Sequence, residues 1–401
     1  MNMRPLNLTG PFSRPRAVWE APGEAYLLWL RGTARAGRLS RARLRPSRKY
    51  TTGSAVDAAA AAAAAAVAAM APRLTSKELL DRCDGFPYMN SHPERYARQM
   101  DKLYTLVWQD SDGVFPIGYM LKSVFDELKL VPPAIRGDMI FDPFSRTVKM
   151  FHKPATERKR TELAAATTRY LRLNQTFKIL KGWRGELWPV YGRNGELLFS
   201  MERAAVALFG YMRYGVHLIA YVHCPTAPYG IKIWVPKRSQ AKSSWPGMFD
   251  STVAGGLTTN EDPFECVIRE ADEEASLPEQ IVRERARLAG LVKYIYVNDT
   301  RVGGGEGYVY PECQWVYDLE LPDDIIPEPN DGEVESFMLC TVAEVREQLA
   351  AGRWKPNCAV IMLDFFVRMG ILTRENEPQF DNIDARLRRQ LPFPGPHDDE
   401  E

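Results

Sequence analysis

The sequence lacks several features that would place it in well-known classes of protein. Its six cysteines form no C-x-x-C pair, and no histidine is spaced from them as zinc ligands are. A disulfide framework or a zinc site is therefore not expected, and we interpret the cysteines as buried thiols in a reducing compartment. No strongly apolar run approaches the roughly 20 residues of a membrane helix. No membrane partner is therefore expected.

A strong charge of one sign is also absent. Lysine and arginine number 52, against 51 aspartates and glutamates. A chain so close to neutral is not expected to bind nucleic acid polymers in general. Its 401 residues are enough for two domains and additional tails, because a domain usually takes roughly 100 to 200 residues.

Residues 1–72 differ in composition from everything that follows. Arginine is frequent, acidic residues are rare, and a low-complexity alanine tract begins at Ala58. This composition is typical of an organellar presequence and predicts a mitochondrial location, with the cytoplasm as the alternative. A disordered basic arm would have the same composition, as would an extension skipped when translation begins at Met70.

The remaining chain divides into two domains and a tail. We expect an N-terminal α+β domain over residues 73–209, a larger α/β domain over 210–375 and a disordered tail over 376–401. In the first domain, apolar spacing predicts an amphipathic helix over 117–128. A charged helix is expected over 154–173.

Hairpins and strand pairs are predicted from β-rich runs that turn residues separate. The expected pairs are 183–191 with the run after Asn194-Gly195, 216–222 with 230–235, and 289–297 with 308–321. A further strand (333–340) and two helices (342–350 and 358–369) follow. The glycine cluster 303–307 is interpreted as a hairpin tip, because it lacks the Lys-Ser/Thr of a phosphate-binding loop.

The most informative segment is a run of carboxylates between Gly255 and Leu277. Asp262 is a good N-cap and Pro263 suits the first helical position, so a helix is expected to end near Ala275. Glu265 is expected to complete a capping box with Asp262.

Three carboxylates share one face of this expected helix. Glu270, Glu273 and Glu274 stand at positions i, i+3 and i+4, and such neighbours repel each other unless a cation lies among them. A glutamate-rich helical face is usually solvated surface. The alternative is a site for a hard divalent ion, Mg²⁺ or Mn²⁺.

The segment resembles the Nudix box, G-x5-E-x7-R-E-U-x-E-E-x-G-U, in which U is an aliphatic residue. The matching residues are Gly255, Glu261, Arg269, Glu270, Glu273, Glu274 and Leu277. Ala271 and Ser276 depart from it, and Ser276 replaces a glycine at the helix exit. The resemblance implies an α/β/α sandwich with a mixed sheet. It also implies metal ligands at Glu270, Glu273 and Glu274, with Arg269 bracing one of them.

Sequence outside and within the box resembles that of the thiamine-pyrophosphokinase-related Nudix group. It includes the stretches Trp245-Pro-Gly-Met-Phe-Asp, Glu273-Glu-Ala-Ser-Leu-Pro and Trp354-Lys-Pro-Asn. This resemblance covers about residues 74–375 and includes an N-terminal domain of uncharacterised type. It implies hydrolysis of small-molecule diphosphates, namely damaged thiamine diphosphates such as oxo- and oxythiamine diphosphate, to monophosphates.

Candidate residues for the reaction lie in and near the box. Glu273 or Glu274 is the expected general base, with Glu261 or Glu335 in reserve. The expected substrate-binding residues are Lys237, Arg238, Lys242, His217 and Trp245. Further aromatic walls could come from Trp234, Phe249 and Tyr308. Each of these has a structural alternative as a surface cation or core residue.

Two other functions stay open at this point. The box equally permits hydrolysis of oxidised nucleotides such as 8-oxo-dGTP. A protein of another class, a non-catalytic sensor of thiamine or nucleotides, could keep the same pocket. The oligomeric state is not predicted, because no motif in the chain bears on it.

Overall fold

The computed structural model of the chain describes residues 73–298 and 306–398. All of them belong to one compact unit of the chain. The presequence hypothesis for residues 1–72 and most of the glycine cluster 303–307 lie outside the described residues. Over the described ranges, no helix is long and apolar enough to cross a membrane.

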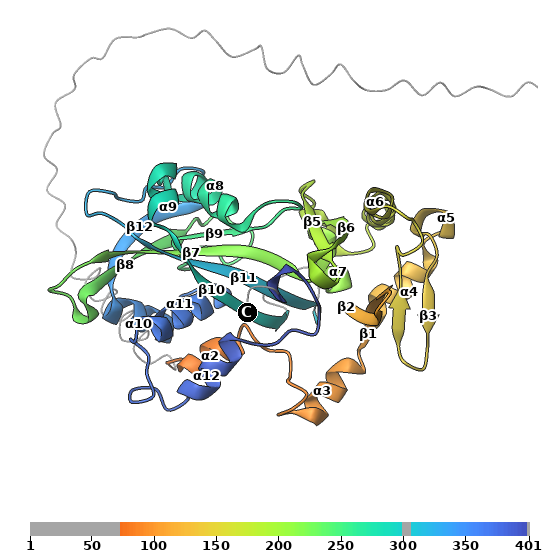
Figure 1. Cartoon of the computed structure of the whole chain (residues 1–401), viewed down its shortest axis with the longest axis horizontal. Helices are drawn as coiled ribbons and strands as arrows, with labels where there is room; N and C mark the ends of the chain where they lie inside the picture. Colours follow the sequence, from red (N-terminus) through yellow and green to blue (C-terminus); the bar gives the residue numbers. More distant parts are fainter. Residues whose placement is uncertain (1–72, 299–305, 399–401) are drawn as a thin grey trace, which may run out of the picture. The chain divides into compact units, whose positions relative to one another are not determined.

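The N-terminal part combines a four-stranded sheet of order β2-β1-β4-β3 with a separate hairpin, β5-β6 (Figure 1). The hairpin turn at Asn194 takes a left-handed conformation (φ 55°), so the predicted turn is confirmed. The elements are α3 (Pro93–Met100), β1 (Leu103–Asp110), β2 (Gly113–Leu121), α4 (Lys122–Leu130), α5 (Pro133–Arg136), β3 (Ile140–Asp142), β4 (Thr147–Lys149), α6 (Glu157–Leu173), β5 (Leu187–Tyr191), β6 (Leu197–Glu202) and α7 (Arg203–Phe209).

Two helices in this part begin later than the sequence predicted. Residues 117–121 lie in strand β2, and helix α4 begins only at Lys122. Strand β2 pairs with β1 along its whole length, and this tertiary pairing overrides the helical spacing of the apolar residues. Helix α6 begins at Glu157 and not at Pro154, because the Thr156 side chain caps it by accepting the N–H of Lys159.

The C-terminal part is built on a six-stranded mixed sheet of order β10-β11-β7-β8-β12, in which β9 also pairs with β7. Strand β7 runs parallel to β11 and antiparallel to β8 and β9. The two predicted strand pairs of this part, β7 with β8 and β10 with β11, are confirmed. The strands are β7 (Arg213–His223), β8 (Ile231–Arg238), β9 (Val253–Gly256), β10 (Arg287–Val297), β11 (Val309–Glu320) and β12 (Val334–Thr341).

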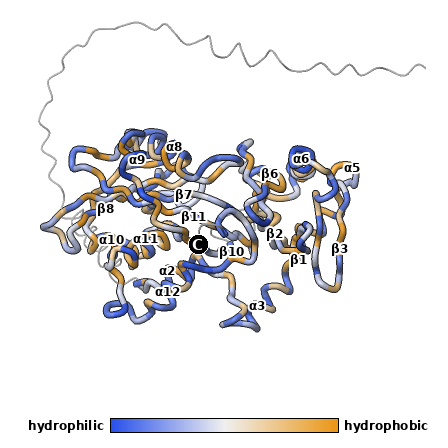
Figure 2. Tube along the Cα trace, viewed as in Figure 1, coloured by the Kyte–Doolittle hydropathy of each residue, from blue (hydrophilic) through white to orange (hydrophobic). Residues whose placement is uncertain are grey.

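Helices cover both faces of this sheet (Figure 1). Helices α8 (Pro263–Ala275) and α9 (Glu279–Arg285) share one buried cluster with strands β7 and β11. Helices α10 (Val342–Ala350) and α11 (Pro356–Arg368) share another with β7 and β8. Helix α11 is mostly apolar (Figure 2), and its residues from Cys358 to Phe366 are buried. The predicted α/β/α sandwich with a mixed sheet is confirmed.

Helix α8 has the predicted bounds but differs from expectation at both ends. The Asp262 carboxylate accepts the N–H groups of Phe264 and Glu265 at 2.8 and 3.1 Å. The capping box is not closed, because the Glu265 carboxylate pairs with Arg283 of α9 at 2.7 Å. At the exit, Ser276 itself adopts the left-handed conformation, with φ 50°, that glycine would take more cheaply.

The expectation of a disordered tail is wrong for residues 376–398. They contain α12 (Phe380–Leu387), and Ile383 on this helix is fully buried. The buried Arg389 donates to Asp84, which lies just after the first helix of the described chain, at 2.6 Å. Polar residues that suggested a solvated tail are thus paired with a buried acid far away in sequence.

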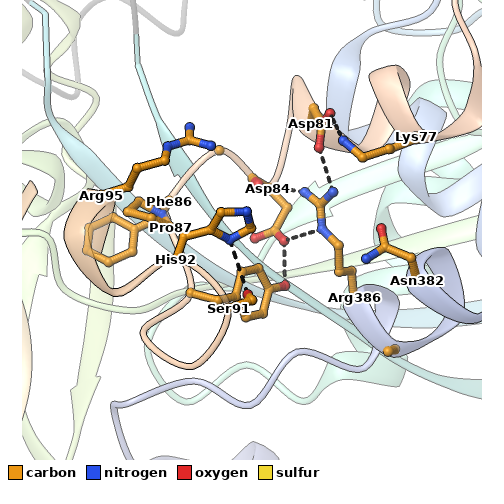
Figure 3. Close-up of a pocket in the computed structure, with 13 residues that line it drawn as sticks. Lys77, Asp81, Asp84, Phe86, Pro87, Ser91, His92, Arg95, Asn382 and Arg386 are labelled. Carbon is orange, nitrogen blue, oxygen red and sulfur yellow. Dashed lines mark hydrogen bonds and ion pairs between the residues drawn. The ribbon is translucent and has the colours of Figure 1, made fainter.

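The first described helix, α2 (Ser76–Asp81), also lies apart from its expected domain. It packs against α11 and α12, and its Leu80 is completely buried in their cluster. The side chain of Arg386 ties these segments together, because it reaches both Asp81 and Asp84 (Figure 3). The C-terminal helical layer therefore includes residues from the beginning of the described chain.

Candidate active site

A cavity of about 440 Å³ lies where helix α8 faces strand β9. It brings together all the acidic residues and the arginine that match the box: Glu261, Arg269, Glu270, Glu273 and Glu274. The segment that follows β8, the loop before β12 and the N-terminal domain supply the other walls. The predicted carboxylate face therefore lines a cavity, with Glu273 at its exposed edge.

Arg269 organises the carboxylates around itself. Its Nε donates to Glu261 at 2.9 Å, and its Nη1 donates to Glu270 at 2.8 Å and Glu273 at 3.0 Å. The second oxygen of Glu261 accepts both the N–H and the hydroxyl of Thr258, each at 2.9 Å. Both oxygens of Glu261 are thus engaged, so this residue holds Arg269 in place.

Glu270 and Glu274 are partly buried acids. Burial raises the pKa of Glu270 to about 7, against the opposing effect of Arg269. Burial also raises the pKa of Glu274 well above its ordinary value, and the charge of Glu270 adds to the shift. One Glu274 oxygen accepts the N–H of Ala254 at 3.0 Å. Two such acids in one cavity, each raising the cost of ionising the other, favour a bound cation.

The donor set fits a hard divalent ion. Over residues 73–298 and 306–398, no three histidine, cysteine, aspartate or glutamate side chains yet converge closely enough to hold one. The carboxylates of Glu270, Glu273 and Glu274 nevertheless supply the oxygen ligands that Mg²⁺ and Mn²⁺ prefer.

Two of the three predicted cations line the cavity, and each already has a partner. Arg238 donates to the buried Asp250 at 2.6 Å, and Lys242 is ion-paired with Glu333. Lys237 is not in the cavity, because successive strand residues point to opposite faces of a sheet. It pairs instead with Glu335 at 2.7 Å. Glu335, the reserve base, is therefore outside the cavity as well.

Several lining residues were missed at the level of sequence. Lys355 lies 3.8 Å from Asp250 and reaches the cavity from the start of α11. Arg184 and Arg203 come from the N-terminal domain. No local motif identifies Lys355, Arg184 or Arg203 as a cavity residue, although Lys355 lies within the stretch Trp354-Lys-Pro-Asn.

His217 does not line the cavity. Its side chain is 2% exposed, and its Nδ1 is 2.9 Å from the Ser251 hydroxyl. Burial lowers the pKa of His217 to about 3, and the charge of Lys355 contributes. Its expected role in substrate binding is thus wrong, and the structural alternative of a core histidine holds.

Trp245 lines a second, smaller cavity of about 250 Å³ beside the first. The walls of this cavity include the aromatic side chains of Tyr294, Tyr296 and Tyr310. The other aromatic candidates, Trp234, Phe249 and Tyr308, line neither cavity. The two cavities share Arg203, Ser244 and Lys355, so an aromatic compartment adjoins the charged one.

A third cavity, of about 450 Å³, lies between α2 and α12 (Figure 3). Its charged side chains are largely paired with each other. Asp81 accepts from Lys77 at 2.6 Å and from Arg386 at 2.5 Å, and Arg386 also reaches Asp84. We interpret this network as one that holds the two helices together.

The fold and the site define a hydrolase of pyrophosphate bonds: a sandwich in which a helix presents arginine-braced carboxylates to a cation-lined cavity. Comparison with known proteins agrees. The profile of the NUDIX domain matches residues 222–359, and that of a domain of unknown function, DUF4743, matches residues 117–213.

Relatives extend this similarity along the chain. "Uncharacterized protein YJR142W" of Saccharomyces cerevisiae is 34% identical over 79% of this chain and 91% of its own length. "Nudix hydrolase 20, chloroplastic" of Arabidopsis thaliana is 38% identical over 53% of this chain, which spans only 54% of that relative. A crystal structure of a Nudix hydrolase from M. smegmatis, RenU, covers 41% of this chain and 90% of its own, at 18% identity and TM-score 0.29. The chain therefore contains a NUDIX domain preceded by a DUF4743 domain, and it is similar to Nudix hydrolases over about half of their length.

Proposed function

We propose that this Nudix hydrolase, with Mg²⁺ or Mn²⁺, removes the terminal phosphate from diphosphates of damaged thiamine, giving monophosphates. The observation that carries the proposal is the pair of partly buried acids, Glu270 and Glu274, in a cavity that also contains Arg238, Lys242 and Lys355. Carboxylates suit the metal, and cations suit the phosphate oxygens.

The roles of the individual residues follow from their contacts. Glu270, Glu273 and Glu274 would hold the metal, which when bound polarises the phosphate and lowers the pKa of a coordinated water. Arg269 holds Glu270 and Glu273 at fixed positions. We assign proton acceptance to Glu274 in preference to Glu273, because the N–H of Ala254 donates to the Glu274 carboxylate and holds it in position.

The second cavity supports a substrate with a flat ring. Trp245, Tyr296 and Tyr310 line it, and aromatic walls suit a pyrimidine or thiazole ring. This cavity shares residues with the carboxylate cavity. One ligand can therefore place its ring in the aromatic cavity and its diphosphate in the carboxylate cavity. Its 250 Å³ suits a small heteroaromatic group.

A substrate panel tests the proposal. The full chain with Mg²⁺ or Mn²⁺ is given oxothiamine, oxythiamine and intact thiamine diphosphates and, separately, 8-oxo-dGTP, with phosphate and pyrophosphate measured independently. Phosphate release that is fastest from a damaged thiamine diphosphate supports the proposal. Pyrophosphate release from 8-oxo-dGTP as the fastest reaction would replace it, and no turnover of any diphosphate would favour the sensor.

The proposed location is mitochondrial, with the cytoplasm as the alternative. It rests on the basic composition of residues 1–72. The Arabidopsis relatives are described as chloroplastic. Import of the full chain into isolated mitochondria, compared with a chain that begins at Met70, would test this location. Equal import of both chains would contradict it.

A further inference from the structure

We propose that the N-terminal domain completes the substrate site and that Arg203 binds the phosphate next to the substrate's ring. This inference rests on the proposed function, because it assumes a diphosphate that carries a flat ring. Arg203 is the first residue of α7 and lines both the aromatic cavity and the carboxylate cavity. Arg203, Ser244 and Lys355 are the residues that both cavities share, so a ligand extending from one to the other would lie beside Arg203.

Contacts within the N-terminal domain hold Arg203 in place. Its Nη1 donates to Glu186 at 2.8 Å, and its guanidinium lies 5.0 Å from the centre of the Trp188 ring. The Trp188 ring in turn packs on Gly256 of β9, where it leaves no room for a Cβ atom. Trp188 therefore contacts both Arg203 and strand β9, the strand that faces the carboxylates.

One buried acid organises this wall. Glu202 is 3% exposed and accepts the backbone N–H groups of Arg184 and Gly185 at 2.9 and 3.0 Å. It is also the N-cap residue of α7, where Arg203 begins the helix. A single carboxylate thus fixes both arginines of the N-terminal domain that line the carboxylate cavity.

Arg203 keeps donors available for a ligand. Its side chain is 33% exposed, and among the described residues Glu186 is its only recorded hydrogen-bond partner. A guanidinium has five N–H donors arranged as a fork, which suits the oxygens of a phosphate. Arg213 is differently placed, because it lines only the aromatic cavity, where it pairs with Glu312 at 2.9 Å.

Kinetics of full-chain variants with Mg²⁺ test this role. Arg203→Gln should raise KM roughly tenfold to a hundredfold and weaken competitive inhibition by inorganic pyrophosphate to the same degree, because charged hydrogen bonds to phosphate are lost. The value of kcat should stay within about threefold. Arg203→Lys should recover part of the KM loss, because it restores the charge but not the fork.

Arg172→Gln is the matched control. Arg172 also lies over a tryptophan, 4.7 Å from the centre of the Trp183 ring, but lines none of the cavities described above. The KM of the Arg172→Gln variant should equal that of the unsubstituted chain. Unchanged KM and pyrophosphate inhibition in Arg203→Gln would overturn the inference. It would equally be overturned if Arg203→Gln and Arg203→Lys both lowered kcat and the melting temperature together.

The two proposals can fail separately. The Arg203 variants are measured on whichever diphosphate of the panel is turned over, including 8-oxo-dGTP. If only the nucleotide is hydrolysed and Arg203→Gln still raises its KM, the thiamine proposal fails and the role of Arg203 stands. If damaged thiamine diphosphates are hydrolysed equally well by Arg203→Gln and by the unsubstituted chain, the thiamine proposal stands and the role of Arg203 fails.

Discussion

The carboxylate of Glu270 occupies the space in which a side chain on Gly255 would stand. A Cβ atom built on Gly255 would overlap the Cγ, Cδ and Oε1 atoms of Glu270. The glycine that opens the box is therefore required by its neighbour across the cavity and not by its own backbone. Strand β9 and helix α8 can approach closely only because Gly255 has no side chain.

Substitution of this glycine should damage the site without unfolding the chain. Gly255→Ala is expected to displace Glu270 and to lower kcat/KM at least about a hundredfold, because a misplaced ligand loses its geometry. Gly182→Ala is the control, since a Cβ there meets nothing within 4 Å. Steady-state kinetics with circular dichroism as a folding check would decide, and equal activity of the two variants would contradict the steric argument.

Loss of the proposed base should affect turnover far more than folding. Glu274→Gln retains an oxygen that can accept the Ala254 N–H, so the melting temperature should hardly change. Turnover should fall by roughly 10²- to 10⁴-fold, as expected for a lost general base. Glu265→Gln, on the same helix but paired with Arg283, should stay near normal. Near-normal turnover in Glu274→Gln would refute the assignment.

The buried histidine should make folding stability depend on pH. The pKa of His217 is about 3 in the folded chain and about 6.5 when unfolded, so the unfolded state binds more protons between these values. Its contribution to stability is present above pH 6.5 and is lost as pH falls towards 3, by roughly 1.4 kcal/mol per pH unit.

Urea denaturation at several pH values tests this contribution. His217→Asn removes the titrating group and should flatten the fall in unfolding free energy between about pH 6 and 4.5. Activity at neutral pH should change little, because His217 does not line the cavity. Identical pH slopes for both chains would show that His217 is not the group responsible.

The exit of helix α8 offers a stabilising substitution. Ser276 is held in the left-handed region while its N–H donates to Asp272 and that of Leu277 donates to Ala271, both at 3.1 Å. Ser276→Gly should raise the unfolding free energy by roughly 0.5–1 kcal/mol, because glycine enters this region without a Cβ penalty. Ser276→Ala keeps that penalty. If thermal melting shows glycine to be no better than alanine, the strain is not significant.

The C-terminal segment should be essential for stability. Arg389→Met removes one partner from Asp84, whose side chain is fully buried, and should cost roughly 2–4 kcal/mol even though Arg386 remains. Arg374→Met breaks only the exposed pair with Asp381 and should have little effect. Urea denaturation compares them, and equal stability of the two variants would contradict a structural role for the buried pair.

Much of this architecture could be predicted because it depends on local signals. The bounds of α8 follow from Asp262 and Pro263, and the hairpin at Asn194 follows from its turn chemistry. Segment 117–121 was mispredicted because its apolar spacing suits a helix, while its pairing with β1 depends on residues elsewhere. The tail was missed for the same reason, since its buried partners lie about 300 positions away in the sequence.

The sequence by itself determined the carboxylate face, because helical periodicity places Glu270, Glu273 and Glu274 together whatever surrounds them. Only the tertiary structure decided that Glu270 and Glu274 are partly buried while Glu273 is exposed. It also decided that Arg238 lines the cavity while Lys237 does not, and that Arg203 reaches the cavity from another domain. Burial and charge pairing depend on which distant segments pack together. Local patterns do not carry that information.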